Sequence, residues 1–169
     1  MAQEDIQVNK HQLNKRTGNN MQFLSFTLGN EEYGVDILRV QEIRSWEPVS
    51  RIPNVAAYEK GVVNLRGSIV PIIDLRERFN LGYAEYTQLT VVVVLQTGDG
   101  NKIRITGVVV DSVSDVVDVD KARIQSAPDF GAKVSTEFIS GLVSVNDRMV
   151  MLLDVDKLLK LDDVTQDES

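Results

Sequence analysis

The amino-acid sequence predicts a mostly β protein made of two copies of one small module. Short runs rich in valine and isoleucine alternate with turns of glycine, asparagine and aspartate, which is typical of small barrels or sandwiches. The second observation is a repeat that relates the two halves of the chain. With 169 residues, 43% of them hydrophobic, the chain is long enough to bury a core in one domain or in two small ones closely joined.

In chain order, the first and last segments are expected to lack stable structure. Residues 1–20 contain no aromatic residue and end in RTGNN, so they predict a flexible arm, and residues 162–169 predict a flexible tail. Strands are expected in the apolar runs between them, namely MQFLSFTLGN, EEYGVDI, KGVVNL, GSIVPII, LTVVVVLQTGDGNKIRITGVVV and EFISGLVSVNDRMVMLL. Within the fifth run, QTGDGNK predicts a hairpin turn, because Asp99 and Gly100 tolerate positive φ.

Short helices are expected where an aspartate ends an apolar run. Asp74 precedes LRERF and is followed three positions later by Glu77, a spacing that predicts a capping box in which each acid accepts from an exposed backbone N–H. Asp154 precedes VDKLLKL, where three apolar residues share one helical face near the C-terminus. A third helical turn is expected in ILRVQEI.

The internal repeat aligns Gly61 with Gly141, an offset of 80 residues. Without a gap, it also matches Val62 with Leu142, Val63 with Val143, Leu65 with Val145, Val70 with Val150, Ile72 with Leu152, Ile73 with Leu153 and Asp74 with Asp154. Upstream, YGVDILRVQEI matches TGVVVDSVSDVV at a different offset, with Gly34 aligned with Gly107 (107 − 34 = 73). We therefore predict two modules, at about residues 21–85 and 86–161.

The repeat isolates Arg66, because the first copy has NLRGS where the second has SVNDR. An arginine at this point is therefore not needed to build the module. Two interpretations stay open. Either the side chain only reaches solvent, or it belongs to an interface, for which Gly61 and Gly67 leave room for close backbone approach. Pro71 is also particular to the first copy and is expected at a sheet edge, a bulge or a strand start.

Charge and composition argue against several classes of function. A net charge of -7 and a pI near 4.7 oppose nucleic-acid binding, which needs clustered lysine and arginine. No apolar run approaches the roughly 20 residues of a membrane helix, and the polar N-terminal residues do not form a signal peptide. We therefore expect a cytoplasmic protein without direct membrane insertion, and the absence of cysteine suits a reducing compartment.

Signatures of catalysis and of ligand binding are scarce. With no cysteine, and one histidine, His11, in the predicted arm, we expect no nucleophilic triad. No GxxxxGK[ST] loop is present, and no cofactor is expected. The aspartates of DSVSDVVDVD lack the ligand pattern of a calcium loop, so we interpret them as solvent-facing, with metal binding as the alternative. Chemistry by carboxylates or lysine stays open, which leaves an unrecognised carboxylate-based enzyme as an alternative to a binding protein.

Five segments together resemble the CheW family of chemotaxis coupling proteins, over about residues 21–161: FLSFTLGNEEYGVDILRVQEIR, RIPN, KGVVNLRGSIVPIIDLRERF, GVVVDSVSDV and STEFISGLVSVNDRMVMLLDVDKLL. The resemblance implies two SH3-like five-stranded β-barrels packed together, with short helices including one near the C-terminus, and with strands that can interleave across the module boundary.

For function, the resemblance implies a non-catalytic adaptor. It would couple the cytoplasmic helical-hairpin tips of chemoreceptors to the regulatory domain of the histidine kinase CheA, and pair with further coupling-protein copies in rings. Its place would be the cytoplasm, recruited to membrane-associated receptor arrays. A scaffold of the same family in a chemosensory pathway that does not drive motility is the alternative.

The resemblance also implies roles for particular residues. Receptor binding or coupling falls on Arg66, Gly61, Val91 and Val113, and kinase binding on Val40, Glu42, Asp129 and Phe130. For the three valines, packing in the core is the competing interpretation. The run VVVV that begins at Val91 predicts a strand covered on both faces, with a barrel seam or an edge offered to a partner as the alternatives.

Overall fold

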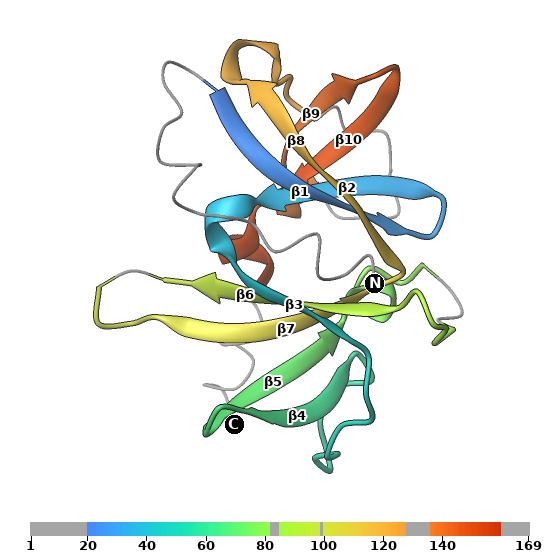
Figure 1. Ribbon diagram of the computed structural model, residues 1–169, viewed down its shortest axis with the longest axis vertical. Helices are drawn as coiled ribbons and strands as arrows, with labels where there is room; N and C mark the ends of the chain where they lie inside the picture. Colours follow the sequence, from blue (N-terminus) through green and yellow to red (C-terminus); the bar gives the residue numbers. More distant parts are fainter. Residues whose placement is uncertain (1–19, 82–84, 99, 128–135, 160–169) are drawn as a thin grey trace.

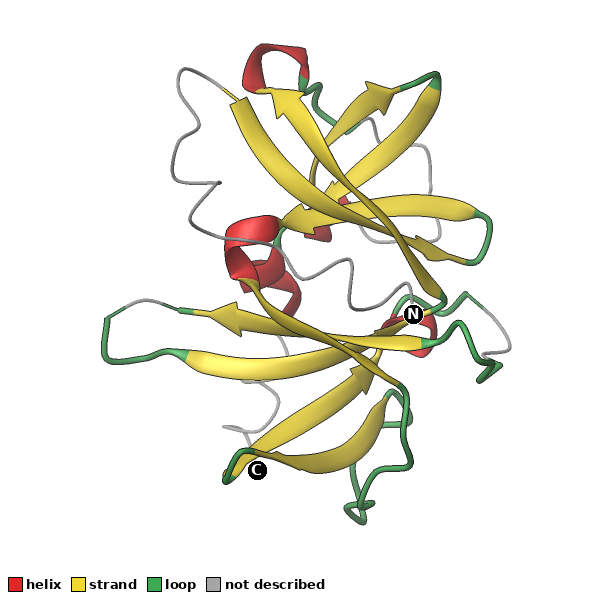
Figure 2. Ribbon diagram, viewed as in Figure 1, coloured by secondary structure: helices red, strands yellow, loops and turns green. Residues whose placement is uncertain are grey.

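The computed structural model describes residues 20–81, 85–98, 100–127 and 136–159, which form two five-stranded sheets. The first sheet contains β1 (Asn20–Leu28), β2 (Glu31–Asp36), β8 (Ser112–Asp120), β9 (Ile139–Val145) and β10 (Arg148–Leu153). The second contains β3 (Val40–Ser45), β4 (Glu59–Leu65), β5 (Ser68–Asp74), β6 (Val91–Thr97) and β7 (Arg104–Val110). The first sheet lies above the second in Figure 1, and Figure 2 shows how little of the chain is helical. The predicted mostly β fold is confirmed.

The order of strands shows that the two copies of the repeat exchange hairpins. The first sheet has the order β8-β1-β2-β10-β9, and the second has the corresponding order β3-β6-β7-β5-β4. Thus the β1–β2 hairpin of the first copy joins three strands of the second copy, and the β6–β7 hairpin joins three strands of the first. The repeat in the sequence divides the chain near residue 85, whereas each sheet contains strands from both sides of that point.

The exchanged hairpins meet the other copy through parallel strand pairs of the same register. In the first sheet Leu152 of β10 lies opposite Gly34 of β2, and in the second Ile72 of β5 lies opposite Gly107 of β7. A Cβ atom at Gly107 would lie 2.6 Å from Ile72 Cδ1, and one at Gly34 would lie 3.2 Å from Leu152 Cδ2. These two glycines, which the repeat aligns, therefore leave room for the large side chain of the parallel neighbour.

The hydrophobic core has three parts, and the strand β6 takes part in two of them. Val91, Val93 and Leu95 belong to a large cluster to which both sheets contribute, whereas Val92 and Val94 belong to a smaller cluster of the second sheet. A further cluster of the first sheet includes Phe23, Val117 and Leu152. Because β6 lies between β3 and β7 and is buried on both faces, VVVV is a covered central strand and not a free edge.

The three predicted short helical segments are present, as η2 (Ile37–Arg39), α2 (Leu75–Arg78) and a helical segment at residues 155–159. Two further short helices, η3 (Lys121–Arg123) and η4 (Thr136–Phe138), were not predicted from the sequence. Among the described residues no helix is long and apolar enough to cross a membrane.

The predicted capping box at Asp74 is only half formed. Asp74 Oδ1 accepts a hydrogen bond from the Arg76 N–H at 3.0 Å, as an N-cap does. The Asp74 N–H, however, donates to the Tyr58 carbonyl at 2.8 Å, and Glu77 pairs with Lys60 instead of reaching back. A backbone acceptor from the preceding loop has taken the place that the sequence pattern assigned to Glu77.

Candidate functional site

Arg66 lies in a turn and not within a strand. It is one of two residues, Arg66 and Gly67, that join β4 to β5, and their φ angles are 52° and 88°. Positive φ at both central residues is the pattern of a type I′ turn, which suits the right-handed twist of a hairpin. The hairpin turn therefore separates the two apolar runs KGVVNL and GSIVPII, in which strands were predicted.

The conformation of Arg66 is unfavourable for a residue with a Cβ atom. The left-handed region costs roughly 1–2 kcal/mol for such a residue, and asparagine, aspartate or glycine usually fills it. The corresponding turn of the second copy follows this preference, with Asn146 at φ 51° and Asp147 at φ 65°. The turn geometry is common to both copies, so it does not explain the arginine, and the side chain itself must account for the choice.

The guanidinium of Arg66 is exposed and oriented by one partner, Glu42. Arg66 Nη2 lies 3.1 Å from Glu42 Oε1, and Nη1 donates to Oε2 at 3.3 Å, in the two-pronged geometry that arginine and carboxylate favour. The side chain of Arg66 is 78% exposed and that of Glu42 23%. An ion pair this exposed adds little to stability. The pair joins a residue expected in receptor binding to one expected in kinase binding.

Gly61 is buried in the wall of the second sheet. Its φ is 145°, and a Cβ atom would lie only 2.1 Å from the Ser50 carbonyl oxygen. This close approach lets Ser50 and Val62 exchange two backbone hydrogen bonds, of 3.1 and 2.9 Å. Gly141 occupies the matching place in the first sheet, beside the bridge between Gln125 and Leu142. Gly61 thus helps to close a barrel.

The three candidate valines pack against the central cluster. Val40 and Val91 are 5% and 3% exposed and belong to the cluster itself, and the partly buried Val113 packs on its edge. Val40 begins β3 and Val113 lies in β8, at positions that the repeat aligns. Substitutions at these positions therefore act on packing first. Asp129 and Phe130 lie outside the described residues.

A buried arginine, Arg76, is the feature that the sequence did not reveal. Its side chain is 4% exposed and donates to both Asp74 carboxylate oxygens, at 3.0 and 2.9 Å, and to the Glu85 carbonyl at 2.7 Å. The Tyr86 hydroxyl donates to Asp74 at 2.8 Å, and the Tyr86 ring stacks on Trp46 with centroids 4.4 Å apart. The only signal in the sequence is the spacing of Asp74 and Arg76 at the start of a short helix.

The electrostatics of this network are those of a permanent ion pair. Burial alone would raise the pKa of Asp74, but the hydrogen bonds from Arg76 and Tyr86 and the charge of Arg76 outweigh it, so the pKa lies below its ordinary value. Burial likewise would lower the pKa of Arg76, yet Asp74 and Asp111 raise it. Burial and the Asp74 carboxylate both raise the pKa of Tyr86. A fully buried carboxylate held in this way does not serve as an acid or base at a cavity.

Two of the aspartates of DSVSDVVDVD have separate structural tasks, and Asp115, Asp118 and Asp120 are exposed, as the interpretation of solvent-facing residues predicts. Asp111 pairs with Arg76 at 3.0 Å, and Asp120 accepts from the Ala122 N–H at the start of η3. Within the described ranges, no group of three or more histidine, cysteine, aspartate or glutamate side chains is placed to hold a metal ion.

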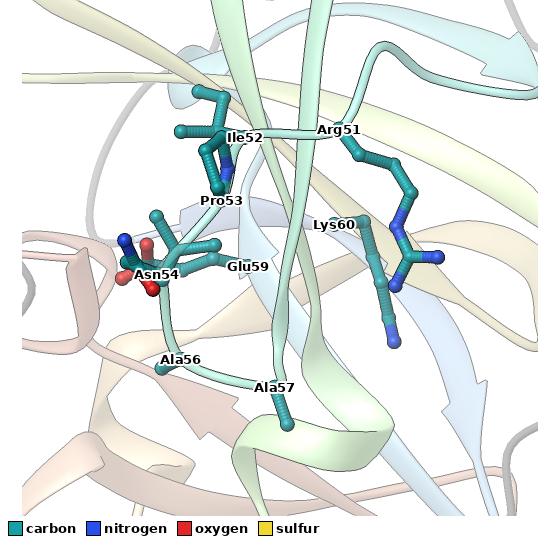
Figure 3. Close-up of a pocket in the computed structure, with 9 residues that line it drawn as sticks. Arg51, Ile52, Pro53, Asn54, Ala56, Ala57, Glu59 and Lys60 are labelled. Atoms are coloured by element: carbon teal, nitrogen blue, oxygen red, sulfur yellow. The ribbon is translucent and has the colours of Figure 1, made fainter.

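The loop between β3 and β4 lines the largest of the cavities described. This cavity has a volume of about 480 Å³ and lies along residues 51–60. Figure 3 shows Arg51 and Lys60 on one side of this loop and Ile52 and Pro53 on the other. A second cavity, of about 240 Å³, lies between the end of β3 and β4 and includes Leu65, next to Arg66. Both are bordered mainly by strands and loops of the second sheet.

Comparison with known proteins gives consistent results. The family model described as CheW-like domain matches residues 22–163. Chemotaxis protein CheW of Klebsiella aerogenes is 49% identical over 143 residues, covering 85% of this chain and 84% of that protein. The protein of the same name from Rhizobium meliloti is 35% identical over 142 residues, covering 84% and 89%. The crystal structure of the scaffolding protein TtCheW from Thermoanaerobacter tengcongensis matches with a TM-score of 0.75 and 27% identity, covering 85% of this chain and 90% of that one.

Proposed function

This chain belongs to the CheW family, and from that premise we propose that it is a non-catalytic adaptor of chemotaxis signalling. It couples the cytoplasmic tips of transmembrane chemoreceptors to the regulatory domain of the histidine kinase CheA. It acts in the cytoplasm, at membrane-associated receptor arrays, where it also pairs with further coupling proteins in rings. The names of its relatives, chemotaxis protein and scaffolding protein, support this assignment.

One observation carries the proposal within the molecule: an arginine held in an unfavourable backbone conformation with its guanidinium in solvent. Arg66 is 78% exposed at the tip of a hairpin, and its φ of 52° is one that asparagine fills in the other copy. Exposed arginines are frequent energetic centres of protein interfaces. Because Glu42 already orients the guanidinium, less side-chain freedom is lost when a partner binds.

The residue assignments come from the resemblance to the CheW family, and we propose a way in which each residue acts. Arg66 contacts the receptor directly, and Glu42 contacts the kinase. Gly61, Val91 and Val113 contribute to receptor coupling, and Val40 contributes to kinase binding, through the packing and closure of the barrels that carry the contact surfaces. Asp129 and Phe130 complete the kinase-binding set.

Binding titrations with purified components test the proposal. The chain should bind a receptor cytoplasmic fragment and the kinase regulatory domain separately. Arg66→Asn is the informative variant, because asparagine tolerates the left-handed conformation and leaves the turn intact. It should weaken receptor binding without lowering thermal stability. Arg148→Ala is the matched control, since Arg148 forms a similar pair with Glu32, at 2.9 Å, beside the corresponding turn of the second copy. Failure of the wild-type chain to bind either partner would refute the proposal.

A further inference from the structure

Two ion pairs lie at the points where the exchanged hairpins meet the other copy. Arg76 follows β5 and pairs with Asp111, which follows β7, with Nη1 and Oδ1 3.0 Å apart. Asp156 follows β10 and pairs with Arg39, which follows β2, with Oδ2 and Nη2 2.6 Å apart. The strands β5 and β7 are parallel neighbours, and so are β10 and β2. Each pair therefore sits at the end of one parallel contact that the exchange creates.

The two pairs occupy corresponding places but have opposite polarity. Arg76 and Asp156 both lie two residues after the aspartate that caps a helix, 80 residues apart in the repeat. Arg39 and Asp111 both lie in the short link that follows the exchanged hairpin, one position apart in the repeat, because Asp111 aligns with Leu38. In the second sheet the paired residue on the helix is basic and the one on the link is acidic, whereas in the first sheet the paired residue on the helix is acidic and the one on the link is basic.

Each carboxylate of these pairs also holds a hairpin turn, so its position is fixed. Asp111 Oδ2 accepts from the Gly29 N–H at 2.7 Å, in the turn between β1 and β2. Asp156 Oδ1 accepts from the Gly98 N–H at 3.3 Å, after β6. The two ion pairs therefore have reversed charges but share one feature, a carboxylate that accepts a hydrogen bond from a hairpin turn.

The short links prevent a copy from closing on itself. If the second copy formed a sheet by itself in the observed arrangement, its strand order would be β8-β6-β7-β10-β9. In that sheet β7 and β8 would be parallel, with β6 between them. A parallel connection needs about a dozen residues. Asp111 alone joins β7 to β8, and only Ile37–Arg39 join β2 to β3. A hairpin could therefore pair with strands of its own kind of copy only in a second molecule, where the β1–β2 hairpin would meet β5 and the β6–β7 hairpin would meet β10.

We propose that the opposite polarity of the two ion pairs directs each hairpin to the other copy of its own chain and away from the like copy of another chain. If the β1–β2 hairpin paired with β5 of a second molecule, Arg39 would meet Arg76. If the β6–β7 hairpin paired with β10 of a second molecule, Asp111 would meet Asp156. Both like-with-like contacts are repulsive, and both contacts within the chain are attractive.

The test exchanges the charges of one ion pair, so that both pairs have the same polarity and both native contacts stay attractive. In Arg39→Asp/Asp156→Arg both sites have a basic helix and an acidic link, so like-with-like pairing is attractive as well. After refolding from denaturant at increasing protein concentration, light scattering coupled to size exclusion measures the dimer fraction. We expect the association constant of the dimer, obtained from the concentration dependence of this fraction, to rise by roughly tenfold over wild type, which corresponds to about 1.4 kcal/mol in pairing energy.

The control is Glu32→Arg/Arg148→Glu, which reverses another ion pair on the same strands, β2 and β10. The repeat places the uncharged Ile105 and Ser68 at the corresponding positions, so this reversal changes no like-with-like contact. Its dimer fraction should equal that of wild type. A neutral variant, Arg39→Gln/Asp156→Asn, removes the repulsion without adding attraction and should give an intermediate dimer fraction. If the polarity-matched and neutral variants both refold to the same monomer fraction as the control, the proposal is wrong.

Discussion

Replacement of the buried Arg76 by methionine should be among the most destabilising single substitutions in this protein. Methionine fills much of the same volume, so the change removes charge and hydrogen bonds more than packing. It leaves the Asp74 carboxylate, which is 0% exposed, with the Tyr86 hydroxyl and one backbone N–H as its remaining donors. The Glu85 carbonyl also loses its partner at 2.7 Å.

The expected loss is about 3–5 kcal/mol, the cost of breaking a buried ion pair from one side. Urea unfolding at pH 7 measures it, and a domain of this size has a total stability of only about 5–15 kcal/mol. Arg39→Met is the control, because its partner Asp156 is 46% exposed and the pair should contribute less than about 1 kcal/mol. A loss below about 1 kcal/mol for Arg76→Met would refute the assignment of Arg76 and Asp74 as a buried structural pair.

Three further predictions concern the turn, the barrel wall and pH. Arg66→Asn should leave the unfolding free energy unchanged or slightly higher while it weakens receptor binding by about 2 kcal/mol, as titration calorimetry would detect; equal losses of both would indicate a structural role. Gly61→Ala should cost more than about 2 kcal/mol in urea, because its Cβ meets the Ser50 carbonyl, whereas at Gly67 nothing lies within 4 Å and about 1 kcal/mol is expected from strain alone. Equal losses would contradict that contrast. Because the pKa of Asp74 is lowered in the folded state, its contribution is fully present above the unfolded value of about 3.9 and is lost as the pH falls through the folded value. Acid unfolding of Asp74→Asn should therefore be less steep than that of wild type, and an unchanged slope would argue against the shift.

The repeat in the sequence was enough to predict two similar β modules, but not which strands share a sheet. Exchange of the β1–β2 and β6–β7 hairpins leaves every strand with the same alternation of apolar residues, because the two copies are alike at these positions. The available signal was the length of the links, since one residue, Asp111, cannot return the chain to its own sheet. Pattern reasoning that looks at strands alone does not use this information.

The same limit applies to the two arginines. Arg66 stood out because the second copy lacks it, yet its turn was hidden, since NLRGS does not carry the usual Asn-Gly or Asp-Gly pair of a type I′ turn. Arg76 was not expected inside, because an arginine is rarely buried without partners; Asp74 is only two residues away, but the second partner, Asp111, lies 35 residues away in the sequence. Long-range ion pairs depend on the fold, and no local pattern predicts them.

Phosphoryl transfer by the kinase, measured with and without each component, tests the account most directly. Autophosphorylation of the kinase should rise only when the chain and receptor fragments are both present, and the chain alone should have no such effect. Arg66→Asn should lose most of this stimulation while remaining folded, and Arg148→Ala should keep it. If the chain left kinase activity unchanged in the presence of receptor, or if both variants behaved as wild type, the assignment as a coupling adaptor acting through Arg66 would be contradicted.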